Sequence, residues 1–168
     1  MDNFDIFLTE LLKNLSPKTK ISIDGNIKNI KAMAHLTTKN YLKTNGDYYK
    51  IIFIDNSFML IIPNDKEIYY ADKIIGKIES VTDDMIGNTK VLEYDGKTYE
   101  LGNKDDYQFV LQLLIGNPYD IEGECRFSDY FPTTGPKEFL SLGWLTRTNE
   151  RADINCKIIN IDKIKIIN

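Results

Sequence analysis

The residues that could carry chemistry are concentrated in one stretch, residues 118–151. It contains all three arginines, the only tryptophan, and a mixture of aromatic and acidic residues. Tryptophan, tyrosine and arginine dominate the energetics of protein interfaces. In a chain that otherwise uses lysine, arginine indicates contacts that need a planar cation, such as bidentate pairing with a carboxylate. We therefore expect a partner or ligand surface formed by Tyr119, Glu122, Glu124, Arg126, Tyr130, Phe131, Trp144 and Arg147.

Two other interpretations of this stretch remain open. In the first, the arginines serve the fold: Arg126 or Arg147 pairs with Asp129 or Asp153, and Trp144 fills the core. In the second, Trp144, Tyr130 and Arg147 line a cleft between two β halves and bind a small ligand. A pocket that holds these three side chains would distinguish the second interpretation from the first.

Carboxylate chemistry is a further alternative. Glu122 and Glu124 would lie on one side of an extended strand, about 7 Å apart, which is compatible with a hydrolase of the glycosidase type. Asp129 could serve the same purpose. Any Glu-x-Glu pattern gives this spacing, however, and charge on the open face of a strand explains it equally well.

The sequence offers little for metal or nucleophilic chemistry. His35 is the only histidine. Cys125 and Cys156 are spaced neither from each other nor from His35 as zinc ligands are. The chain has no Gly-x-Ser-x-Gly motif and no glycine-rich phosphate loop. We expect a half-buried structural His35, reduced cysteines packed in strands, and no catalytic residue, cofactor or metal.

Composition and charge narrow the class of partner. The 168 residues carry a net charge of −4, with a pI near 5.1. The lysines are dispersed along the chain, which disfavours nucleic acid as a partner. No apolar run approaches the length of about 20 residues that spans a bilayer, and the acidic N-terminus does not resemble a signal peptide. These features indicate a cytoplasmic protein with no membrane segment.

Apolar spacing predicts most of the elements. Apolar residues at i, i+3, i+4 and i+7 predict a helix over residues 4–15. Asp24-Gly25 and Asp95-Gly96 each predict a two-residue β-hairpin, and residues 48–70 predict a hairpin that is covered on both faces. Residues 32–36 could extend a strand or form a helical turn. Further strands are expected near 67–70, 74–81, 124–131, 137–145, 154–161 and 163–167.

A second helix of about ten residues is predicted near the middle of the chain. Tyr107, Val110, Leu111 and Leu114 recur at helical spacing, Asp105-Asp106 could cap the start, and Gly116 could end it. The predicted fold is therefore α+β and mainly β. It consists of antiparallel hairpins or meanders, an N-terminal helix and one central helix.

A faint internal repeat suggests how the chain is organised. Phe58 and Phe139, 81 positions apart, match in type, as do Tyr49 and Tyr130 and the Ala-Asp pairs at 71–72 and 152–153. This predicts two related β-meanders. We expect a single domain over 1–168, with sub-units 1–81 and 89–168 and a soft boundary at 82–88.

The sequence shows no constellation that fixes an activity. The favoured hypothesis is a non-catalytic, acidic interaction module of bacterial or phage type, such as an inhibitor, immunity or assembly protein. It would bind a protein partner through the second half of the chain. A small-ligand-binding domain and a carboxylate-dependent hydrolase are the alternatives.

Overall fold

The chain folds mainly into antiparallel β-structure with one α-helix in the part that the computed structural model describes, residues 1–39, 46–121, 125–145 and 147–168. The helix, α1 (Asn3–Asn14), is the predicted N-terminal one, and Asp2 caps it by accepting a hydrogen bond from the Asp5 amide. The strands are β1 (Lys20–Ile23), β2 (Asn26–Thr38), β3 (Tyr48–Phe53), β4 (Phe58–Ile62), β5 (Glu67–Ala71), β6 (Val91–Tyr94), β7 (Lys97–Ile115), β8 (Cys125–Pro132), β9 (Glu138–Leu145), β10 (Ile154–Ile159) and β11 (Ile164–Ile167). Three short 3-10 helices are η1 (Asp83–Met85), η2 (Pro118–Asp120) and η3 (Ile161–Lys163).

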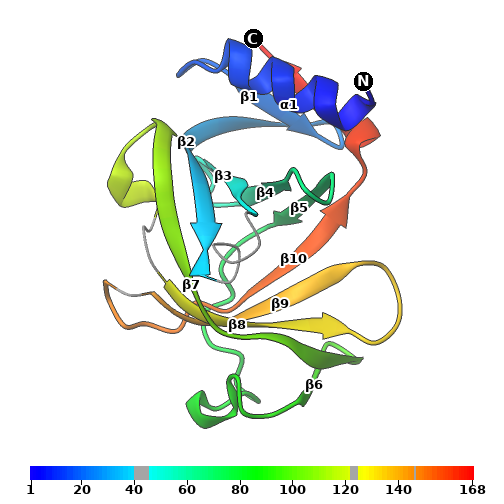
Figure 1. Ribbon diagram of the computed structural model, residues 1–168, viewed down its shortest axis with the longest axis vertical. Coiled ribbons are helices and arrows are strands. Elements are labelled where there is room, and N and C mark those ends of the chain that lie inside the picture. The colour runs from blue at the N-terminus through cyan, green and yellow to red at the C-terminus, as the bar shows by residue number, and fades with distance from the viewer. Residues whose placement is uncertain (40–45, 122–124, 146) are drawn as a thin grey trace.

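Eight of the described strands form a closed antiparallel barrel. Strands β2 to β5 pair in sequence order, and so do β7 to β10. The pairings β2–β7 and β5–β10 then join the two meanders into a ring (Figure 1). Closure removes the open sheet edges that each meander would otherwise expose.

The two meanders share one plan. Each begins with a two-residue hairpin, β1–β2 around Asp24-Gly25 and β6–β7 around Asp95-Gly96. Both aspartates and both glycines have positive φ, as this turn requires. Strand order therefore repeats between a first half (β1–β5) and a second half (β6–β10). The 81-residue offset matches β3 to β8 and β4 to β9, but it fails at β10 because the connection from β9 is longer.

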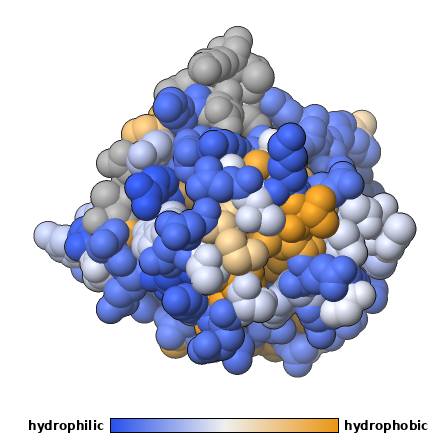
Figure 2. All heavy atoms as spheres, turned by 90° about the horizontal axis from the view of Figure 1, so that it is seen from below, coloured by the Kyte–Doolittle hydropathy of each residue, from blue (hydrophilic) through white to orange (hydrophobic). Residues whose placement is uncertain are grey.

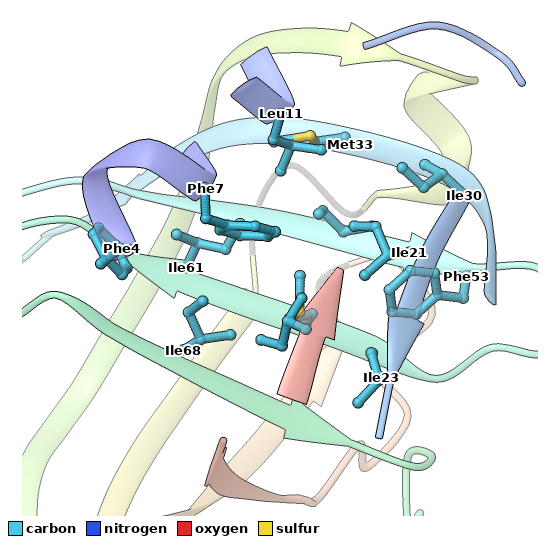
Figure 3. Packing of buried hydrophobic residues seen from close by; sticks show 13 residues of the cluster. Phe4, Phe7, Leu11, Ile21, Ile23, Ile30, Met33, Phe53, Ile61 and Ile68 are labelled. Carbon is cyan, nitrogen blue, oxygen red and sulfur yellow. The ribbon is translucent and has the colours of Figure 1, made fainter. Parts of the chain in front are cut away.

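The outer face of the first half is covered by α1. Phe4, Phe7 and Leu11 pack onto β2, β4 and β5, where they meet residues such as Met33 and Ile61 (Figure 3). The β1–β11 pair completes this outer cluster. The apolar stripe predicted for the helix therefore packs on the protein's own sheet.

The outer face of the second half is covered differently, by the segment between β5 and β7. Ile78, Val81 and Ile86 of this segment pack against Tyr130 and Leu142 of the barrel. A third cluster lines the barrel interior and draws its residues from both halves, for example Leu36, Phe58 and Cys156. The 48–70 hairpin is covered on both faces, as predicted, because Met59 and Ile61 join the outer cluster while Phe58 and Leu60 join the inner one.

The central helix predicted over 107–114 is wrong, because these residues form the second half of β7. Pairing with β2 places Leu113 opposite Ala34 and Val110 opposite Leu36, with register shifts that leave an extra residue in β7 at Leu111 and at Leu114. Each bulge stretches the inward spacing from two residues to three. Three-residue spacing in a bulged strand imitates a helical stripe, and the exposure of Leu111 (53%) marks the bulge.

The strand pairing decides two further expectations, for residues 32–36 and 74–81. Residues 32–36, left open between strand and helical turn, belong to β2. Residues 74–81 do not form the predicted strand: they contribute one isolated bridge, Gly76 with Asp153, and otherwise run as an irregular cover. None of the helices in the described ranges is long and apolar enough to cross a membrane.

Candidate ligand cavity

The barrel encloses a cavity of about 660 Å³ between the two halves. Side chains alternate along each strand, so every second residue points inward. On β3 these residues are Tyr48, Lys50 and Ile52, and on β8 they are Phe127, Asp129 and Phe131. This volume lies within the range typical of small-molecule pockets, about 300 to 1,000 Å³. The cavity is the candidate functional site.

Aromatic rings form a large part of the cavity wall. They come from both halves of the barrel: Tyr48, Phe58, Tyr69, Phe127, Phe131, Phe139 and Trp144. Tyr69 and Phe139 meet edge to face with their ring centres 5.1 Å apart, and Phe131 tilts against Phe139 at 6.1 Å. Such a wall offers contact area and quadrupole interactions to a flat or apolar molecule.

One carboxyl group lies in the wall among polar neighbours. Asp129 accepts a long hydrogen bond from Asn103 (3.4 Å) and lies opposite Ser141 on β9. Its Oδ1 atom is buried and has no hydrogen-bond partner in the described part of the chain. Burial raises the pKa of Asp129 to about 7, the charge of Asp106 adds to the rise, and Ser141 and Asn103 partly oppose it. Acid and carboxylate are therefore both populated near neutral pH.

One ammonium group also faces the cavity. The Nζ of Lys50 lies 5.0 Å from the centre of the Phe58 ring. Within the described ranges no ion pair involves Lys50, whereas Lys31 pairs with Asp120 (3.6 Å) and Lys137 with Glu67 (2.8 Å) at the cavity rim. The interior thus holds a cation on β3 that has no counter-ion among the described residues.

Cys156 lies on β10 next to this wall and is fully buried. Burial raises the pKa of its thiol far above the usual range, and the Asp129 carboxyl adds to the rise, while Lys50 lowers it. A thiol held protonated in this way packs as a small apolar group and is a poor nucleophile.

The cavity wall reaches solvent at apolar residues. Ile74 and Phe131 both line the cavity and are 48% and 38% exposed. Seen from below the view of Figure 1, the surface is mainly hydrophilic around an apolar area (Figure 2). Apolar surface framed by polar residues is typical of ligand entrances and of contact sites.

The six sequence-predicted residues that the structure describes lie in different settings. Tyr119 is 73% exposed and stacks with Arg147 at 5.3 Å, and Arg147 also donates to the Tyr119 carbonyl at 3.2 Å. Arg126 lies over Trp144 at 4.3 Å, and both border the cavity, as does Phe131. Glu122 and Glu124 lie outside the described residues.

The predicted cleft lining of Trp144, Tyr130 and Arg147 needs correction, because only Trp144 borders the cavity. Tyr130 points to the outer face of β8, where its hydroxyl accepts from the Gly87 amide (3.0 Å) and donates to the Thr89 carbonyl (2.7 Å). Strand alternation explains the difference, since Tyr130 is adjacent to the inward Asp129 and must face the other way.

The arginine with a structural role is Arg151, which the sequence interpretation paired with nothing. Its guanidinium donates to both carboxylate oxygens of Asp153 at 3.1 and 2.5 Å, and to Asp83 at 2.9 Å. Asp153 is fully buried and also accepts from the Ile78 amide at 2.9 Å. This network connects residues 72–90, which cover the outer face of the second half, to the barrel.

Other candidates for chemistry have structural settings. The Nε2 of His35 lies 2.6 Å from Asp47 Oδ2, and its ring stacks on Tyr49 at 4.6 Å. In the described ranges, no three His, Cys, Asp or Glu side chains form a group that could hold a metal ion. Asp106 contributes charge to Asp129 but does not line the cavity.

Comparison with known protein families, with curated proteins and with solved structures finds no match to this chain. Two residues of the cavity, Lys50 and Asp129, lie far apart in the chain, and no sequence motif links them. The available signal was Lys50, the one charged residue inside the apolar run of β3.

Proposed function

We propose that this protein binds a small, largely apolar organic molecule inside the barrel. The observation that carries the proposal is the cavity of about 660 Å³ with its aromatic wall. Single ligand pockets combine such a wall with a few placed polar groups. Here those groups are Lys50, Asp129 and the neighbouring Asn103 and Ser141, contributed by strands of both halves.

The geometry favours binding over catalysis as the role of these groups. Asp129 is the one carboxyl among them, and the buried thiol beside it is a poor nucleophile. Separated polar groups around an apolar space orient a ligand without activating a bond. The proposal therefore keeps the ligand-binding alternative, but most of the residues that line the site differ from those expected from the sequence.

The test uses N-phenyl-1-naphthylamine, an uncharged apolar dye whose fluorescence rises on leaving water. Titration of the folded protein is expected to show one saturable site. Ile52→Trp, which directs an indole into the cavity, should abolish binding, because Ile52 lines the wall. Ile54→Trp is the matched control, since Ile54 is 63% exposed and does not line the cavity.

Circular dichroism and thermal unfolding establish that both variants are folded. Absence of saturable binding to the wild type would overturn the proposal. Equal binding by Ile52→Trp and wild type would also overturn it, because it would place the dye outside the barrel.

A second candidate function is recognition of a protein partner, favoured by one exposed pair. Tyr119 and Arg147 combine an exposed aromatic ring with a stacked guanidinium, and these residue types dominate interface hot spots. The partner-binding module with a surface in the second half thus remains a proposal.

Its test separates the surface from the cavity. Wild type and Ile52→Trp should recover the same stoichiometric partner from native lysate, while the double variant Tyr119→Ala, Arg147→Ala should lose it. A partner retained by the double variant, or no stoichiometric partner at all, would count against this function.

A further inference from the structure

The charges inside the barrel bear on which ligand it takes. Nine charged residues line the cavity, but most of them lie at its rim, where Lys31 and Lys137 already have carboxylate partners. Lys73 is exposed to solvent. Lys50 differs from these, because its ammonium lies over the Phe58 ring within the barrel and forms no ion pair with any described residue.

The positive charge of Lys50 is not balanced by a negative charge from any described residue. The face of Phe58 supplies a cation–π contact, which only partly replaces water around the charge. In the described part of the chain, the carboxyl of Asp129 makes no ion pair with Lys50. A ligand anion beside Lys50 would add a charge-assisted hydrogen bond in surroundings where it is worth more than in water.

The opposite wall supplies a different kind of contact. Asp129, Asn103 and Ser141 form a polar group on β7, β8 and β9, and the Asp129 Oδ1 atom has no hydrogen-bond partner among the described residues. Such a group suits an uncharged polar substituent of the ligand, such as a hydroxyl or amide. The rings of Phe58 and Phe139 lie on the cavity wall and offer contacts to an apolar body.

We propose that the ligand is an amphipathic organic anion, whose carboxylate, sulfonate or phosphate group pairs with Lys50 and whose apolar body lies against the aromatic wall. This inference rests on the proposed function. It deepens it by naming the charge that the ligand carries and the residue that recognises it.

The test compares two dyes of nearly the same ring system. 1-Anilinonaphthalene-8-sulfonate carries a sulfonate, and N-phenyl-1-naphthylamine carries no charge. In the folded protein, Lys50→Met should weaken sulfonate binding by about tenfold, as expected for the loss of one charge-assisted contact. Binding of the neutral dye should change by less than about twofold.

Two further variants control for charge and fold. Lys77→Met makes the same charge change at an exposed position outside the cavity, so both dyes should bind it as they bind the wild type. Lys50→Arg keeps the charge and should retain sulfonate binding. If Lys50→Met does not fold, Lys50→Gln takes its place, since it also removes the charge and should weaken the binding of the sulfonate dye alone.

The outcomes separate the two proposals. If neither dye binds, the cavity function itself is overturned. If the neutral dye binds but Lys50→Met affects both dyes equally, or neither, only the role of Lys50 is overturned. Full sulfonate affinity in Lys50→Gln would overturn it as well.

Discussion

The two halves of the barrel follow one strand plan but differ in how they are covered. Phe58 of β4 and Phe139 of β9 hold matching places and both line the cavity. Outside the barrel the halves diverge. The first half is covered by an apolar helix face, whereas the second is covered by an irregular segment that polar contacts fasten to the barrel. The comparison teaches that the two halves match at these cavity-facing positions and differ in the contacts that hold their outer cover.

The same contrast holds residue by residue. Ala152-Asp153 and Ala71-Asp72 match in sequence, yet Asp153 is fully buried in an arginine network while Asp72 is exposed. Tyr130 binds three backbone groups of the cover through its hydroxyl, whereas Tyr49 stacks on His35. In each pair the residue of the second half is buried and anchors the cover, whereas its counterpart in the first half is more exposed.

Asp153→Ala should be the largest of the single-residue effects on stability. It leaves the guanidinium of Arg151 without its buried partner and removes the acceptor for the Ile78 amide. Breaking a buried charge pair costs about 3 to 5 kcal/mol of unfolding free energy, measured here by urea denaturation. Asp72→Ala, at the matching exposed position, should change stability by less than about 0.5 kcal/mol. Equal effects of the two substitutions would remove the contrast between the halves.

Asp129→Asn should change the pH dependence of stability. Burial raises the folded-state pKa of Asp129 from its ordinary value of 3.8 to about 7, so the folded protein holds a proton that the unfolded chain releases above pH 4. Stability from this group is fully present below pH 4 and is lost as the pH rises to 7, by up to about 4 kcal/mol.

The measurement is unfolding free energy at pH 4, 6 and 8. Asp129→Asn should flatten the fall between pH 4 and pH 8 and be more stable than the wild type only at the upper end. Asp65→Asn, an exposed control at the cavity rim, should follow the wild type. Parallel curves for Asp129→Asn and wild type would show that this carboxyl does not resist ionisation. The matching position in the first half, Tyr48, carries no carboxyl, so the effect belongs to the second half alone.

Tyr130→Phe should give the smallest effect that still separates the halves. It removes a hydroxyl that accepts from Gly87 and donates to Thr89, so it should cost about 1 to 2 kcal/mol. Tyr49→Phe should cost less than about 0.5 kcal/mol, because the stacking of its ring on His35 is kept. Hydrogen exchange should locate the loss at the amides of residues 85–89, and unchanged protection there would contradict the role of Tyr130 as an anchor.

Local signals in the sequence predicted the elements whose causes are local. The helix α1, both Asp-Gly hairpins and the strands β8 to β11 lie close to their expected positions. Closure of the barrel depends on pairs such as Leu36 with Val110 and Ile68 with Ile159. These residues are far apart in the chain, and a single sequence carries no local mark of such pairings.

The cavity was missed for a related reason. Lys50 and Asp129 line the same cavity only once the barrel is closed, so the sequence does not indicate that they belong to one site. The bulges of β7, a strand of the cavity wall, give its apolar residues the spacing of a helix. Trp144 lines the cavity, whereas Tyr130 and Arg147 do not, because residues that are close in sequence can face opposite sides of a strand.

The closed ring has a thermodynamic consequence. Because β2 holds β7 and β5 holds β10, a molecule seated in the barrel contacts strands of both halves, and it cannot keep those contacts if either half opens. Occupancy is then linked to global unfolding, and a ligand at 100 times its Kd raises the unfolding free energy by about 2.7 kcal/mol. The melting temperature of the whole chain can therefore serve as the detector in a screen of organic anions, with Lys50→Met as its reference.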